Sequence, residues 1–133
     1  LDLSGDLATG VDGKGGLPEL DRSKAGVAIT LAATLLYFLN RHGEPVGLEL
    51  LAGDAAGPRS FPARSGKNHL QMLFLALAGA RPGGTAGLGD ALSRVGSRVR
   101  RHAFVTVLTD GMEEPETWLP SLGAFARRGA DLR

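Results

Sequence analysis

Three short polar loops hold the residues of this chain that have the most capacity for chemistry. They are residues 2–6 (Asp-Leu-Ser-Gly-Asp), 83–85 (Gly-Gly-Thr) and 108–111 (Leu-Thr-Asp-Gly). Carboxylate and hydroxyl oxygens delivered by separate loops are the ligands that a hard divalent cation prefers, in near-octahedral geometry. The loops therefore predict a site for Mg²⁺ or Mn²⁺. Its candidate ligands are Asp2, Ser4, Asp6, Thr85 and Asp110.

Apolar segments on either side of these loops predict alternating helices and strands. Helices are expected over residues 23–41, 66–80 and 88–101, and a last one, which contains two prolines, over about 115–128. Strands are expected over residues 46–52, 59–62 and 103–108, with the end of a strand at 1–4 and the start of another at 129–133. This alternation is typical of an α/β fold with right-handed crossovers.

Two of these segments carry predictions about burial. The helix over 23–41 is apolar on nearly all sides, and we expect it to pack in a crowded layer against a sheet. Its predicted inner face consists of Val27, Leu31, Leu35, Phe38 and Leu39. Residues 103–108 form a continuous β-branched and aromatic run, which is typical of a central parallel strand covered on both faces.

The predicted fold brings the polar loops together. In an open, doubly wound sheet, ligands bind beyond the carboxyl ends of the strands, at the point where the strand order reverses. Asp2 and Ser4 follow the first strand, and Asp110 follows the strand that ends at Leu108. If these two strands are neighbours, their loops converge, and Thr85 opens the third helix from the same side.

The ordered set of loops resembles the metal-ion-dependent adhesion site of the von Willebrand factor A domain. More narrowly, residues 24–39 with the following Arg-His-Gly-Glu-Pro-Val-Gly-Leu, residues 62–70 and the Gly-Gly-Thr loop resemble the bacterial domain of unknown function 58 family. The resemblance spans almost the whole chain. It implies a Rossmann-like, doubly wound, mostly parallel sheet with helices on both faces. Residues 1–133 would be a single domain of this kind, truncated at both ends and part of a longer protein.

The resemblance also implies a role for each site residue. Ser4 would bind the metal directly through its hydroxyl, while Asp2 and Asp110 would hold water molecules around the ion. Thr85 would bind directly in one state and through water in another. Asp6 departs from the family pattern, which usually has serine here; a third acid would raise the affinity for the cation but weaken its attraction for a partner's carboxylate. Alternatively, Asp6 turns away and water fills its position.

The function implied by the resemblance is protein–protein interaction through a divalent-cation-dependent face. Genes of the family commonly lie beside those of MoxR-type AAA+ ATPases, so such an ATPase is the expected partner, in the assembly or maturation of other proteins. Two alternatives stay open. Residues 2–6 also fit a polar strand-end turn in a metal-free structural or interaction domain, and the acids also fit a metal-assisted phosphohydrolase. Because no activated nucleophile is visible, we do not expect an enzyme.

Composition excludes several other classes of function. The net charge of +1 provides no general basic field for nucleic acid, and the absence of cysteine excludes disulfides and thiolate metal sites. The three histidines fall in separate elements, which argues against a zinc hydrolase. The longest apolar stretch, residues 25–39, is too short to span a bilayer. We expect a cytoplasmic domain without membrane contact of its own, with any membrane anchor supplied by flanking segments.

Overall fold

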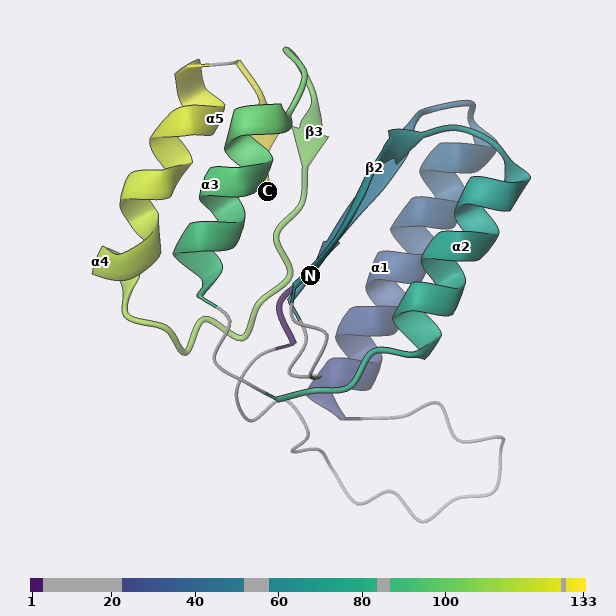
Figure 1. The fold of residues 1–133 in the computed structure, drawn as a ribbon, viewed down its shortest axis with the longest axis horizontal. Coiled ribbons are helices and arrows are strands. Elements are labelled where there is room, and N and C mark those ends of the chain that lie inside the picture. Colours follow the sequence, from purple (N-terminus) through teal and green to yellow (C-terminus); the bar gives the residue numbers. More distant parts are fainter. Residues whose placement is uncertain (4–22, 52–57, 84–86, 128) are drawn as a thin grey trace.

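A computed structural model describes residues 1–3, 23–51, 58–83, 87–127 and 129–133, and the structural statements below concern these residues (Figure 1). Helices and strands alternate along them, so the predicted α/β class is confirmed at this level. The elements are α1 (Lys24–Arg41), β1 (Val46–Leu50), β2 (Arg59–Arg64), α2 (Lys67–Ala78), α3 (Leu88–Arg98), β3 (Phe104–Val105), α4 (Pro115–Trp118), the 3-10 helix η1 (Leu119–Leu122), α5 (Gly123–Arg127) and β4 (Asp131–Leu132).

The strands form two short ladders that the first three residues connect. β1 and β2 are antiparallel, whereas β3 and β4 are parallel. Asp2 forms a parallel bridge with Leu51 on one side, and on the other its backbone N–H donates to Leu108 O over 2.8 Å. The described residues thus show a mixed α/β arrangement with two two-stranded sheets. The single doubly wound sheet stays a prediction.

Helices lie on both sides of these strands, and each side has its own apolar cluster (Figure 1). On one side, α1 and α2 pack over β1 around Leu36, Leu50 and Leu73. On the other, α3 and α5 pack around Leu92 and Phe125. Leu50 and its neighbour Leu51 belong to different clusters, because successive side chains of a strand point to opposite faces.

The predicted inner face of α1 is wrong for three of its residues. Val27 is 60% exposed, Leu31 45% and Phe38 57%, while Ala25, Ala32 and Leu36 are buried. The physical reason is that a helix with apolar residues on nearly every side has no strong periodicity to give its direction. Small residues then form the buried side, since they let the helix axis approach the sheet. Leu39 does pack against the core as expected.

The prediction that residues 103–108 are covered on both faces holds only toward the end of the segment, where Leu108 packs against the first apolar cluster. Val105 and Val107 pack into the second apolar cluster, but Phe104, on the opposite side of the strand, is 54% exposed. The helices of that side, α1 and α2, lie over β1, so they leave Phe104 uncovered (Figure 1). The segment still pairs as a strand beyond β3, since Val107 N–H donates to Arg133 O over 2.7 Å.

Local sequence signals explain where the helices begin and end. The Ser23 hydroxyl accepts a hydrogen bond from the Gly26 amide over 3.0 Å, so Ser23 is the N-cap of α1. The predicted last helix is interrupted: α4, η1 and α5 follow one another, with Pro120 inside the 3-10 turn, where its missing N–H removes a helical hydrogen bond. In the described part of the chain, no helix combines the length and the apolar character that crossing a membrane requires.

Candidate functional site

The first and third polar loops are joined through Asp2. Its side chain is 3% exposed, and its Oδ2 accepts a hydrogen bond from Thr109 Oγ1 over 2.9 Å. Its backbone N–H donates to Leu108 O over 2.8 Å. Both the main chain and the side chain of Asp2 are therefore fixed against the end of the segment that carries Asp110.

The second loop is held at both of its described flanks. Gly83 N–H donates to Leu3 O over 2.9 Å, and Gly83 has a φ of 130°, a conformation that glycine adopts without strain. On the other flank, Leu88 N–H donates to both carboxylate oxygens of Glu113, over 2.9 and 3.2 Å. The residues that border the Gly-Gly-Thr loop are thus bound to segments that carry the first and the third loop.

Asp110 lies in a tight turn built by side-chain hydrogen bonds. Met112 N–H donates to Asp110 Oδ1 over 3.2 Å, and Gly111 N–H donates to Thr109 Oγ1 over 3.1 Å. Gly111 has a φ of 68°, which explains the glycine in the Thr-Asp-Gly sequence. This turn orders the loop from within, and it leaves Asp110 half-buried next to the Thr109 that binds Asp2.

The structure describes two of the five predicted ligands. Asp2 and Asp110 are placed as above, whereas Ser4, Asp6 and Thr85 lie outside the described residues. Among the residues that are described, no group of three or more histidines and acids is arranged to hold a metal. The possible metal ligands among the described residues are the carboxylates of Asp2 and Asp110 and the hydroxyl of Thr109. All of them bind through oxygen, which suits Mg²⁺ or Mn²⁺ better than a softer metal.

Sequence reasoning missed two residues that organise this region. Thr109 directly precedes Asp110, so its position next to a candidate ligand was the available signal. Glu113 caps α3 from a separate segment, and Gly87, the N-cap residue of α3, has no side chain for that purpose. No local pattern pairs Glu113 with Leu88, since 25 residues separate them.

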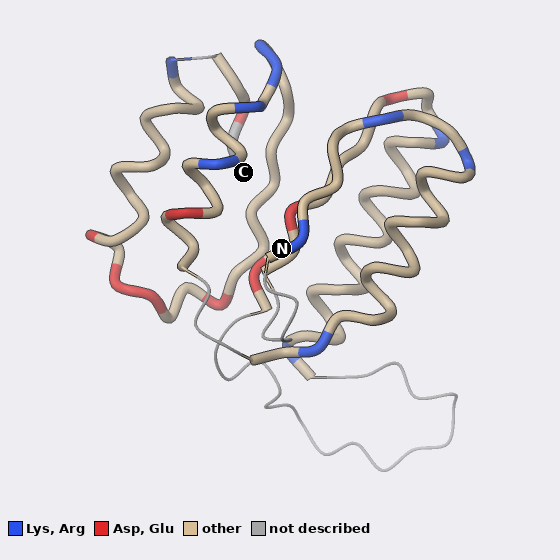
Figure 2. Tube along the Cα trace, in the orientation of Figure 1, with Lys and Arg blue, Asp and Glu red and all other residues tan. Residues whose placement is uncertain are grey.

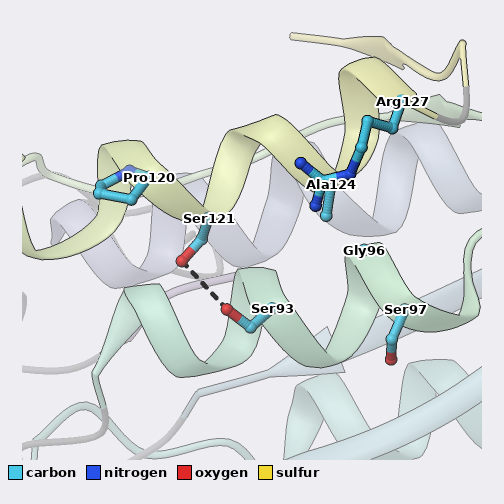
Figure 3. Close-up of a pocket in the computed structure, with 7 residues that line it drawn as sticks. All are labelled: Ser93, Gly96, Ser97, Pro120, Ser121, Ala124 and Arg127. Atoms are coloured by element: carbon cyan, nitrogen blue, oxygen red, sulfur yellow. Dashed lines mark hydrogen bonds between the residues drawn. The ribbon is translucent and has the colours of Figure 1, made fainter.

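A separate groove lies between α3 and the η1–α5 segment (Figure 3). Its volume is about 520 Å³, and the Ser93 hydroxyl donates to Ser121 Oγ across it over 3.1 Å. Among the described residues that line it, none is a histidine or carboxylate that could activate a serine. The residues that line it are Ser93, Gly96, Ser97, Pro120, Ser121, Ala124 and Arg127.

Comparison with known proteins gives one match. A family model described as "Protein of unknown function DUF58" matches residues 15–131, which is most of the chain. No curated protein and no solved structure that was compared matches the chain.

Proposed function

This chain belongs to the DUF58 family of proteins of unknown function, and we propose that it is a protein–protein interaction domain with a divalent-cation site of the von Willebrand A type. The ion would be Mg²⁺ or Mn²⁺, at the meeting point of the three polar loops. The proposal includes a sheet in which residues 1–3 are the central strand between β1 and the segment 103–108, with helices wound on both faces.

The hydrogen bond between Thr109 and Asp2 is the observation that carries this proposal. It joins the first and third loops at 2.9 Å, and the bond from Gly83 to Leu3 holds the start of the second loop beside them. Asp2 and the segment that carries Asp110 are therefore held together although they are far apart in the sequence, which supports a shared site for a hard cation.

The proposed ligands then have distinct tasks. Ser4 and Thr85 supply neutral hydroxyls, while Asp2, Asp6 and Asp110 supply negative charge. A bound cation would act as a Lewis acid that accepts a carboxylate from a partner protein. We propose a MoxR-type AAA+ ATPase as this partner, by kinship with the family and not from a contact in the structure.

Calorimetric titration with MnCl₂ and with MgCl₂ tests the site. We expect heat of binding in the parent chain, a strong loss in Ser4→Ala and Asp110→Asn, and no change in Asp131→Asn, a matched control at an exposed acid of β4. Asp6→Ser should weaken cation affinity and strengthen binding of a carboxylate-bearing partner. Absence of heat together with an unchanged melting temperature would favour a metal-free interaction domain.

The partner requires its own measurement. A purified MoxR-type ATPase immobilised on a biosensor should bind the chain in MgCl₂ and lose it in EDTA. Binding that persists in EDTA and in Ser4→Ala would show that the interaction does not depend on the cation, which contradicts the proposed mechanism even if a metal binds.

A further inference from the structure

The outward side of the two helices α1 and α2 is an exposed apolar surface. Its five large side chains are 44–68% exposed, and we call this surface the α1–α2 face. It consists of Val27, Leu31, Phe38, Met72 and Leu75. The two helices lie side by side over β1 (Figure 1), and these five are among the most exposed large apolar residues of the described chain. Several large apolar side chains exposed on two neighbouring helices indicate an interaction site, because proteins seldom leave much apolar surface of this kind uncovered.

Two threonines on the same side of α1 add to its apolar character. Thr30 Oγ1 donates to Gly26 O and Thr34 Oγ1 donates to Thr30 O, each over 2.8 Å. Because both hydroxyls are bonded within the helix, the threonines need no partner for their donors. No charged side chain lies between Lys24 and Arg41, which are about 26 Å apart at 1.5 Å per residue.

Positive charge flanks the α1–α2 face at both of its ends. Neither helix contains an aspartate or glutamate. The helices are antiparallel (Figure 1), so Lys24 at the start of α1 lies near Arg81 beyond the end of α2, while Arg41 and Lys67 lie at the opposite end. Figure 2 shows Lys and Arg segments at both ends of the helix layer and uncharged chain between them; one acid, Glu44, lies in the turn after α1.

A hollow opens in the seam between the two helices at the Lys24 end. Its volume is about 410 Å³, and its walls include the small residues Ala25, Gly26 and Ala78 together with Ile29. Arg81 stands at its rim, where its guanidinium donates to Ala80 O over 3.0 Å. A cavity of small apolar residues beside an exposed guanidinium suits a large apolar side chain next to an acid.

We propose that the α1–α2 face binds an amphipathic helix of a partner protein, uncharged through its middle and acidic at both ends. One large apolar side chain of this helix fills the hollow, and its terminal acids pair with Lys24 and Arg81 at one end and with Arg41 and Lys67 at the other. A second copy of this chain fits less well, because pairing two such faces places cations opposite cations in either direction. The inference rests on the proposed interaction function, but it uses a surface separate from the cation loops.

Nuclear magnetic resonance titration of the ¹⁵N-labelled chain tests this proposal. The probe is a synthetic peptide as long as α1, 18 residues, with leucines on one face, a phenylalanine near one end and glutamates at both ends. A second peptide has lysines in place of the glutamates. We expect shifts confined to α1 and α2 with the acidic peptide only, weaker binding at high salt, and no effect of EDTA.

Three variants locate the binding surface. Leu75→Ser and Ala78→Phe, which fills the hollow, should each weaken binding of the acidic peptide at least about tenfold. Leu119→Ser changes an apolar residue of similar exposure on η1 and should leave binding unchanged. All three positions are exposed, and the dispersion of each amide spectrum reports whether the variant is folded.

Each other outcome contradicts the proposal. Equal binding of both peptides, unchanged binding in Ala78→Phe, or no binding would overturn it. So would flotation with vesicles of phosphatidylcholine and phosphatidylglycerol without peptide binding, which would indicate a lipid surface, or a dimer in sedimentation that Leu75→Ser dissociates. Calorimetry with MnCl₂ separates the two proposals: loss of peptide binding with intact cation binding refutes only this one.

Discussion

Thr109 donates its hydroxyl hydrogen bond to the buried carboxylate of Asp2 over 2.9 Å, although 107 residues separate the two. The same hydroxyl oxygen accepts the Gly111 amide over 3.1 Å. One side chain therefore orders the Thr-Asp-Gly turn and also fixes the acid of the first loop. A cation bound at these loops would share the Asp2 carboxylate with Thr109, so Thr109 positions a ligand whether or not it contacts the ion.

Thr109→Val should lower the free energy of unfolding by about 1.5–3 kcal/mol, because it leaves a buried carboxylate without one of its donors. Urea unfolding followed by circular dichroism measures this. Thr109→Ser keeps the hydroxyl and should recover most of the loss. Thr34→Val is the matched control, since Thr34 also donates to a single acceptor but lies on the exposed side of α1; its effect should stay within about 0.5 kcal/mol. Equal losses in Thr109→Val and Thr34→Val would show that the Asp2 contact has no special weight.

Glu113→Ala should loosen the start of α3. The Glu113 carboxylate accepts the Leu88 amide through both oxygens, and Gly87 offers no side-chain cap, so the variant leaves a helix N-terminal donor unsatisfied. We expect a loss of about 1 kcal/mol and faster hydrogen exchange in the first turn of α3. Glu114→Ala removes the neighbouring exposed acid, which makes no side-chain cap, and should leave that exchange unchanged. Faster exchange in both variants would indicate a general charge effect.

Much of the fold follows from local signals in the sequence. The helices α1 and α3 and the strand β1 are each determined by a few neighbouring residues, and they lie within the ranges predicted from the sequence. The direction that α1 faces does not follow from such signals. Its apolar residues surround the helix, and only tertiary packing against β1 decides that Leu36 is buried and Leu31 exposed.

The candidate site is likewise predictable from the sequence only in part. The polar loops are recognisable because turn residues and oxygen ligands stand at the ends of apolar runs. The contact between Asp2 and the third loop depends on the pairing of residues 1–3 with Leu51 and Leu108, which is long-range and cannot be predicted from neighbouring residues. The contribution of Glu113 is hidden for the same reason: an acid that caps a helix from a distant segment cannot be told from any other surface glutamate.

The orientation of α1 can be tested by two truncations of the same residue type. Leu36→Ala should cost about 2–4 kcal/mol of unfolding free energy, because it opens a cavity in the cluster between α1 and β1. Leu31→Ala removes a side chain that is 45% exposed and should cost less than about 1 kcal/mol. Urea unfolding of the two variants gives the comparison. A larger loss of unfolding free energy in Leu31→Ala than in Leu36→Ala would instead support the inner face predicted from the sequence.

Gly96 lets α3 and α5 approach closely beside the groove of Figure 3. A Cβ at Gly96 would lie 2.8 Å from the Cβ of Ala124, which is closer than such atoms pack. Gly96→Ala should therefore lose about 1–3 kcal/mol of stability, even though alanine favours a helix interior by up to about 1 kcal/mol over glycine.

A double-mutant cycle separates this clash from other effects of the alanine. Ala124→Gly removes the opposing Cβ, so Gly96→Ala combined with it should show a favourable coupling of about 1–2 kcal/mol. Ala126→Gly is the control: it makes the same change at an exposed position of α5 and should not couple to Gly96→Ala. If Gly96→Ala stabilises the chain, or if both double variants couple alike, the close contact between the two helices is not what requires glycine at this position.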